Sequence, residues 1–534
     1  MKLNRSIGLV GLTLIATGGI LGSGWLFAPE LVARDAGPAA ILSWVIGAVI
    51  MLLLALTFAE VSGMLPVAGG LAQVPLFSHG KLVSTVMAWT AWVGYAVTAP
   101  IEVSAMMKYM SAWIPEFERA GDGRLPLMAL LAGLGILAVM VFINAWGVHI
   151  FTRVNSGLTW IKVLLPAIIV GAFLSERFDL ANFTTPSFAP FGYEGILTGV
   201  STGGVIFAFL GFRHAIDLAG EVRSPHRTIP IALISALLFC LVIYIGAQAA
   251  FTGALTGTEL GGGWQALDFG HDYGPFADLG LSLGLVWLLS LIYASAIIAP
   301  FGGGLVSTGS NARLAMAMAS NGQFPKLIAR ISPEGVPLYA LLLNWCIGAA
   351  ALALATFQQM VSLTSAAIVL SLVSGPIAVH ALRRQLPDRP RYFRLPAVGL
   401  LANLGFIAAT LTLYWSGWTS IRLLLFLILA GLVLFLLFRR LSDTRESLDL
   451  REALWLLPYL VGLGLLSYFG NFGDGRGLIP FGWDLALAAL LSLVIFAYAG
   501  QSRLHPAAVL DYLAESEKSV KPAGSKNNEI QQSP

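Results

Sequence analysis

Long apolar runs recur along the whole chain and are separated by short polar segments. Each run holds about 20 residues, enough for a helix to cross roughly 30 Å of hydrocarbon. The pattern predicts an all-α polytopic membrane protein with about fourteen transmembrane helices. The runs are centred near residues 18, 50, 96, 137, 163, 207, 241, 293, 347, 370, 405, 430, 461 and 490. We interpret the first run as a retained span and not as a signal peptide, because no small-residue cleavage site follows it.

The composition fits a chain whose solvent is a bilayer. Of 534 residues, 57% are hydrophobic and 11% are charged, whereas soluble domains carry about a quarter charged residues. Lys and Arg gather on alternate loops, as in the cluster at 383–394, and the loop at 253–278 is acidic without Lys or Arg. The positive-inside rule then predicts cytoplasmic termini and a bacterial inner membrane. The polar tail over 501–534 lacks apolar periodicity, which predicts disorder.

Several classes of function are disfavoured. The loops are too short for a soluble catalytic domain, and neither H-E-x-x-H nor a nucleotide-binding G-x-x-x-x-G-K-[ST] occurs, so we expect neither an enzyme nor an ATP-driven pump. Cys240, Cys346 and the scattered histidines give no metal-ligand spacing. We therefore expect no metal, no other cofactor and no nucleic-acid partner. The sequence does not indicate the oligomeric state.

Two apolar runs are interrupted by glycine at mid-depth. The first is broken at Ile20–Trp25, and the sixth is broken around Phe207–Arg213, after Gly203 and Gly204. These two runs cross in opposite directions. Broken spans five apart are typical of an inverted repeat of five plus five helices. Close helix packing is the alternative, because glycine also serves that purpose in membranes.

Four motifs carry a resemblance to a known family. They are G-S-G-W-L-F-A-P at Gly22–Pro29, P-V-A-G-G at Pro66–Gly70, F-A-F-L-G-F at Phe207–Phe212 with Glu221, Pro225, Arg227 and Pro230 behind it, and the stretch Ser310–Pro325. At these residues the chain resembles the amino acid–polyamine–organocation transporter superfamily, nearest to permeases like aspartate–proton symporters. Asn321 stands where that superfamily often has Asp.

The resemblance implies a LeuT-type fold with broken helices 1 and 6. It places the transport core at 1–384, in repeats over about 6–176 and 193–384, then about four additional transmembrane helices at 385–500 and the tail at 501–534. The implied activity is secondary active transport of an amino acid by alternating access.

An unwound helix at mid-membrane offers free backbone groups to a ligand. Amides at the start of the half-helix after Ile20 suit a carboxylate, and freed carbonyls on both broken spans suit an ammonium group. By the same resemblance, Phe207 would be an aromatic lid and Trp25 a second gate residue. The predicted substrate-binding residues are Ile20, Gly22, Ser23, Gly24, Phe207, Ala208, Leu210 and Arg213.

Lys162 lies ten residues into the fifth apolar run, and an ionisable group at that depth indicates function. In proton-coupled members of the superfamily, a lysine on span five stands at the sodium position, so Lys162 is the predicted proton-coupling residue. The alternative for Lys162 is a permanently charged lysine bonded to first-span carbonyls. Glu102 is a second predicted coupling residue, and the alternative for Glu102 is that it faces Lys108 or solvent nearer the outside. The hydroxyls of Ser307, Thr308 and Ser310 keep sodium coupling open.

Arg213 needs an anionic partner inside a membrane. One candidate is the side-chain carboxylate of a bound aspartate or glutamate, and the other is Asp217 at i+4. Glu60 is expected at a helix end or gate. The sequence thus favours proton-coupled symport of an acidic L-amino acid. It leaves open sodium-coupled or exchange transport of a neutral amino acid, and a membrane sensor that transports nothing.

Overall fold

The computed structural model of the protein describes residues 7–67, 69–118, 123–146, 148–269, 273–332, 335–441 and 448–520. Within these residues the chain forms twenty α-helices. They are α1 Leu9–Ile20, α2 Gly24–Ala36, α3 Ala40–Met64, α4 Gly70–Met110, α5 Leu127–Ala145, α6 Val148–Glu176, α7 Gly192–Ser201, α8 Val205–Phe209, α9 Arg213–Asp217, α10 Pro225–Ala254, α11 Pro275–Ser282, α12 Val286–Ser320, α13 Leu338–Leu354, α14 Phe357–Leu372, α15 Ser374–Gln385, α16 Val398–Trp415, α17 Gly417–Leu441, α18 Leu456–Phe469, α19 Trp483–Gln501 and α20 Pro506–Val520. No β-strand forms in these ranges, so the predicted all-α class is confirmed.

The helices have the length and surface of membrane spans. The described residues hold ten helical stretches long and apolar enough to cross a bilayer, with α2 and α3 counted as one stretch and α14 and α15 as another, or eleven if the bent pair of α7 with α8 and α9 is one span. The helices α1, α13 and α18 are shorter and also apolar. Large apolar side chains point outward, among them Leu127, Val242 and Leu457, each at least 70% exposed. Such side chains are well solvated by lipid tails, and the protein is a multi-pass membrane protein as predicted.

The first expected interruption is present between α1 and α2. α1 ends at Ile20 and α2 begins at Gly24, with the three residues between them outside both helices. The Gly22 amide bonds the Ile20 carbonyl at 2.9 Å, which turns the chain tightly between the two half-helices. Amides at the start of α2 and carbonyls at the end of α1 are thereby released from their own helices.

The second interruption lies at Thr202–Gly204, earlier than the break predicted at Phe207–Arg213, whose residues form the end of α8, a tight turn and the start of α9. Gly204 adopts φ +98° there. Only glycine takes this left-handed conformation freely. The chain bends by 40° between α7 and the following α8 and α9. The tight turn η4 at Leu210–Phe212 then separates α8 from α9.

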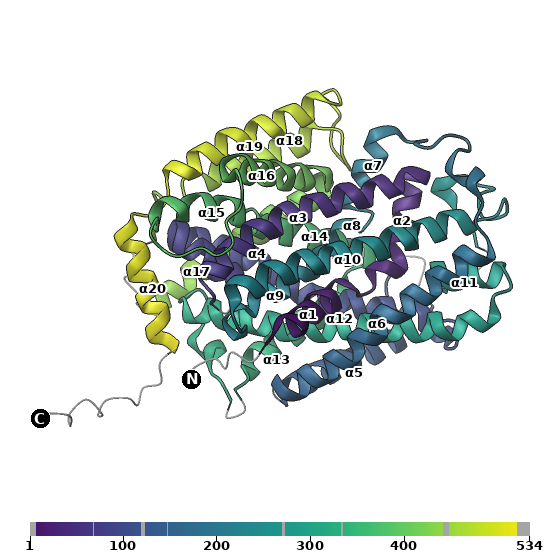
Figure 1. The fold of residues 1–534 in the computed structure, drawn as a ribbon, viewed down its shortest axis with the longest axis horizontal. Helices are drawn as coiled ribbons and strands as arrows, with labels where there is room; N and C mark the ends of the chain where they lie inside the picture. The colour runs from purple at the N-terminus through teal and green to yellow at the C-terminus, as the bar shows by residue number, and fades with distance from the viewer. Residues whose placement is uncertain are drawn as a thin grey trace, which may run out of the picture.

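The two interrupted segments meet at Gly19 and Gly211. A Cβ on Gly211 would overlap the backbone of Gly19 and Ile20, so two main chains touch there. The half-helix α1 contacts α6, α9, α10 and α12, and Figure 1 shows it in the middle of the molecule, with α18 and α19 along one edge and α5 along the opposite edge. The breaks are therefore enclosed by other helices, which is the environment that non-helical backbone needs at membrane depth.

A further break occurs inside α4, at Gly80, which has φ +81° and ψ −167°. It separates a short helix, residues 70–79, from a long one, residues 81–110. The long part contacts α12 and α14 extensively and carries Glu102.

The tail differs in part from the disorder expected over 501–534. Residues Pro506–Val520 form the helix α20, which contacts α4. Val509 and Leu513, four residues apart, are buried, and the Tyr512 hydroxyl donates to Asp449 at 2.6 Å. A short apolar stripe with one polar anchor thus holds the helix, although its period was too brief to stand out in the sequence. Residues 521–534 lie outside the described part of the chain.

Candidate functional site

A small cavity lies where the two broken helices meet α4. It collects six of the predicted site residues, including Glu102 of the coupling pair. Its lining residues are Gly19, Ile20, Gly24, Thr98, Glu102, Phe207, Ala208, Gly211, Arg213 and His214. The other five predicted residues lie outside this lining: Gly22, Ser23, Trp25, Lys162 and Leu210.

Glu102 binds the start of α2. Its Oε2 accepts the backbone N–H of Ser23 at 2.7 Å, and its side chain is 3% exposed. A Cβ on Gly22 would overlap Glu102 Oε1, so only glycine leaves room for this carboxylate. An anion at a helix N-terminus is favoured by the helix dipole and by amides that the helix leaves free.

Lys162 of α6 binds the end of α1. Its side chain is fully buried, and its Nζ donates to the carbonyl oxygen of Gly18. Thr159, one turn earlier, packs against Gly18, where a Cβ would lie 2.6 Å from Thr159 Oγ1. The helix dipole favours a cation at a helix C-terminus, just as it favours an anion at a helix N-terminus.

Two of the hydroxyls considered for a sodium site, those of Thr308 and Ser307, differ in their hydrogen bonds. Thr308 Oγ1 donates to the Gly304 carbonyl of its own helix at 2.8 Å. The Ser307 hydroxyl is buried without a hydrogen-bond partner among the described residues.

Arg213 lies in the cavity wall with few partners. Its side chain is 1% exposed, and Nη2 donates to Thr98 Oγ1 at 3.1 Å. The guanidinium lies 4.2 Å from the ring centroid of Tyr95, a cation–π arrangement. Nε has no hydrogen-bond partner among the described residues.

Asp217 is held by Tyr95. The Tyr95 hydroxyl donates to Asp217 Oδ2 at 2.5 Å, and no ion pair within 4.0 Å joins Asp217 to Arg213 in the described chain. The direct i+4 pair that the sequence left open is therefore absent. Tyr95 lies between the two charges, stacked on one and hydrogen-bonded to the other.

The carbonyls expected to bind an ammonium group face a tyrosine. The hydroxyl of Tyr244, on α10, lies 2.8 Å from the Ile20 carbonyl oxygen and 3.1 Å from that of Ala208. One hydroxyl hydrogen can be donated to only one acceptor at a time. The two broken helices are therefore linked through one side chain from a third helix.

The two gate candidates differ in position. Phe207 lines the cavity and is 8% exposed. Trp25 is fully buried outside the lining, with its ring 5.3 Å from that of Phe276 on α11.

Sequence reasoning missed Thr98, Tyr95 and Tyr244. Each lies in an apolar run, and its only signal is a hydroxyl that requires a partner when buried. It also overlooked a G-x-S-x-G match at Gly199–Gly203. Ser201 ends the helix α7 and its Oγ approaches the Thr198 carbonyl of that helix at 3.3 Å, without the strand–turn–helix setting of a hydrolase nucleophile.

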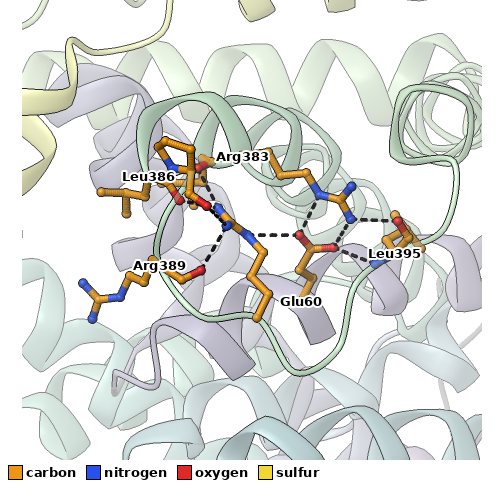
Figure 2. A network of polar contacts seen from close by, with 8 residues as sticks. Glu60, Arg383, Leu386, Arg389 and Leu395 are labelled. Atoms are coloured by element: carbon orange, nitrogen blue, oxygen red, sulfur yellow. Dashed lines mark hydrogen bonds and ion pairs between the residues drawn. The ribbon is translucent and has the colours of Figure 1, made fainter.

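Glu60 organises a separate polar network at the end of α3. Arg383 of α15 donates to both its carboxylate oxygens, at 2.8 and 2.7 Å, and the Leu395 amide donates to Oε2 at 2.7 Å. Arg391 Nε lies 3.5 Å from Oε1. Figure 2 shows the carboxylate enclosed by these groups. Glu60 thus lies at a helix end and fastens α3 to α15 and the loop behind it.

Comparison with known proteins decides the family. Residues 7–438 match the amino acid permease family. The chain belongs to that family. It is therefore a member of the amino acid–polyamine–organocation superfamily and a membrane transporter of amino acids, as the sequence motifs predicted.

Two bacterial permeases are similar over nearly the whole chain. The glutamate/serine transporter AimA of Bacillus subtilis is 36% identical over 512 residues, covering 94% of each protein. The aspartate-proton symporter of the same organism is 34% identical over 514 residues, covering 95% of this chain and 98% of that protein. A branched-chain amino acid permease, BcaP, is 26% identical over 461 residues.

Proposed function

We propose that this permease is a secondary active transporter that carries an acidic L-amino acid, aspartate or glutamate, together with protons by alternating access. The observation that carries the proposal is the arrangement of Arg213. Its guanidinium is buried in the cavity wall, stacked on Tyr95, with Nε unbonded among the described residues. A buried cation of this kind requires an anion, and a carboxylate fits a guanidinium bidentately.

An acidic amino acid carries one more carboxylate than a neutral one, and the site offers two places for anions. The α-carboxylate would bind the amides of Ser23 and Gly24, next to Gly22, whose own amide bonds the Ile20 carbonyl. The side-chain carboxylate would bind Arg213. The ammonium group would bind carbonyls near Ile20 and over Phe207–Leu210. Phe207 would cover the bound substrate as an aromatic lid. Trp25 would be a second gate residue.

The relatives support this substrate class. The names of the two most similar permeases described above include glutamate and aspartate. The first name also includes serine, so a neutral amino acid, with exchange or sodium coupling, is the second candidate.

Lys162 and Glu102 are the proposed coupling residues. Lys162 is buried against the end of α1, and Glu102 against the start of α2. A change in charge at either position would change how firmly the two half-helices are held, which links protonation to their movement. The proton is the proposed coupling ion. Sodium would have to use the hydroxyls around Ser307.

The proposed architecture is the LeuT type, with two inverted repeats of five helices inside residues 1–384 and about four further crossings in 385–500. It is supported by breaks in the first and sixth spans that meet at Gly19 and Gly211. The count of about fourteen crossings treats α1 with α2, α7 with α8 and α9, and α14 with α15 as single spans, and leaves out the short α11 and the tail helix α20. A bacterial inner membrane with both termini in the cytoplasm is the proposed location.

Uptake of radiolabelled L-aspartate into proteoliposomes tests the proposal. An inward proton gradient without sodium should drive uptake in the wild type, and Lys162→Ala should abolish the dependence on the gradient. Arg213→Ala should lose aspartate uptake and keep that of serine. Arg476→Ala is a matched control, because Arg476 also stacks on a tyrosine, Tyr468, at 5.0 Å but lies far along the chain from the cavity.

Different outcomes separate the parts of the proposal. Uptake of serine without aspartate would remove the acidic substrate class. Uptake that requires sodium would remove the proton as the coupling ion, with the family membership unaffected.

A further inference from the structure

The groups that would hold the backbone of an amino acid already have partners within the chain. The Ser23 amide, at the start of α2, is bound by the Glu102 carboxylate at 2.7 Å. The carbonyls of Ile20 and Ala208 face the Tyr244 hydroxyl at 2.8 and 3.1 Å. A carboxylate and a hydrogen-bond donor from α4 and α10 thus stand where the two ends of an amino acid would bind.

The fit of Glu102 is built into the surrounding glycines. A side chain at Gly22 would overlap Glu102 Oε1, and a Cβ on Gly303 of α12 would lie 3.2 Å from the same oxygen. The carboxylate therefore lies between two glycine backbones with its other oxygen on the Ser23 amide. This is the geometry of an anion site at a helix N-terminus, filled by the protein itself.

We propose that Glu102 is an internal competitor for the substrate carboxylate. In the empty site it caps α2, and an arriving amino acid must displace it before its own α-carboxylate can bind the same amides. The inference rests on the proposed function only in placing the α-carboxylate of the substrate at α2. It holds for any α-amino acid, acidic or neutral.

Glu102 and Tyr244 hold the two broken helices in a defined arrangement through contacts within the chain. Without Glu102, the Ser23 amide at the start of α2 would be left without this partner in a buried site, which is costly. With it, the two half-helices stay bound to α4 and α10 until a ligand with both a carboxylate and an ammonium group replaces both contacts. A ligand with only one of these groups replaces only one contact and binds weakly.

Equilibrium binding to the purified protein tests the competition. Radiolabelled L-aspartate and L-serine are both measured, and the amino acid that the wild type binds is the probe. Glu102→Gln keeps the shape of the side chain and removes the competing charge, so we expect about tenfold tighter binding of the amino acid. This change corresponds to the interaction free energy of a charge with a helix terminus. Glu194→Gln, at an exposed position on α7, is the control and should bind as the wild type does.

A carboxylate without an ammonium group gives an independent measurement. In Glu102→Ala the amides of α2 are open, and acetate should fill them. We expect acetate to raise the thermal unfolding temperature of Glu102→Ala and to leave the wild type and Glu194→Ala unchanged. Equal effects of acetate on all three proteins would overturn the proposal, as would weaker amino acid binding by Glu102→Gln.

A structure of the wild type with bound amino acid decides the matter if the variants do not fold. The proposal expects the contact between Glu102 and the Ser23 amide to be broken and the ligand carboxylate to take its place. A ligand bound while that contact stays at hydrogen-bond distance would overturn it. If serine binds and aspartate does not, the acidic substrate class is wrong. The competition between Glu102 and the substrate carboxylate is then tested with serine as the ligand.

Discussion

The Lys162 ammonium and the Glu102 carboxylate lie against consecutive glycines of α12, Gly302 and Gly303. A Cβ on Gly302 would be 3.0 Å from Lys162 Nζ, and one on Gly303 would be 3.2 Å from Glu102 Oε1. Lys162 binds the Gly18 carbonyl near the end of α1, and Glu102 binds the amide before α2. Opposite charges therefore hold the two helix ends that favour them, and glycines of a third helix make the space.

Alanine substitutions along α12 should show whether the space around Lys162 and Glu102 matters more for uptake than helix packing elsewhere on α12. Gly302→Ala crowds Lys162, and Gly303→Ala crowds Glu102, so each should lower gradient-driven uptake at least tenfold with little loss of folded protein. Gly304→Ala is the control, because its Cβ would crowd the flexible end of Met140, at 2.8 Å, and would meet Glu102 only at its Cβ, at an ordinary contact distance of 3.5 Å, and not at its carboxylate. Initial uptake rates in proteoliposomes, with thermal unfolding of each variant, provide the check. Equal losses at all three glycines would contradict the specific role of the first two.

The contact between the two broken segments should tolerate no side chain. In Gly211→Ala, the new Cβ would overlap the backbone of Gly19, and a backbone cannot move aside as a flexible side chain can. We expect little folded protein and no uptake, measured by size-exclusion chromatography and transport. Gly135→Ala is the control, because nothing lies within 4 Å of its Cβ on α5. Normal folding of Gly211→Ala would mean that the two segments are further apart.

The sequence could predict the breaks and the buried charges because their signals are rare inside membrane runs. Glycines at Gly22 and Gly204 interrupt helices, and Lys162 and Arg213 stand deep in apolar stretches. The outward apolar surface and the all-helical class follow from the same runs of hydrophobic residues.

The partners of those charges could not be predicted, because they depend on how helices are rotated against each other. Glu102 could face solvent or the protein interior with equal ease by sequence, and it faces Ser23. Tyr95 separates Arg213 from Asp217, although i+4 spacing suggested a direct pair. Hydroxyls in apolar runs are common, so nothing in the sequence singles out Tyr244.

Removing the Tyr95 hydroxyl should cost more than removing a similar buried hydroxyl. In Tyr95→Phe the Asp217 carboxylate loses its 2.5 Å partner inside the protein, and we expect a loss of about 2 kcal/mol of stability. The ring that stacks on Arg213 remains. Tyr459→Phe is the control, since the Tyr459 hydroxyl meets the neutral Thr410 hydroxyl at 3.0 Å, and its loss should cost about 1 kcal/mol. Thermal unfolding in detergent measures both, and equal shifts would show that Asp217 does not depend on Tyr95.

Glu60 should stabilise the protein more than a less buried acidic residue in a similar pair. Its carboxylate is 1% exposed and accepts two hydrogen bonds from Arg383 and one from the Leu395 amide. In Glu60→Gln the charge is removed, and Arg383 is left facing an amide that cannot accept at both ends. Because the Arg383 side chain is 27% exposed, solvent replaces part of the lost interaction, and we expect a cost of about 2 kcal/mol.

Glu30→Gln is the control for Glu60. Glu30 also binds an arginine, Arg34, through two hydrogen bonds, but the pair is i,i+4 on one helix and more exposed, at 18% and 31%. Solvent screens such a pair, so its loss should cost at most about 1 kcal/mol. Thermal unfolding of both variants measures the difference. Similar small shifts would mean that the network around Glu60 contributes little, and that α3 is held to α15 mainly by apolar packing.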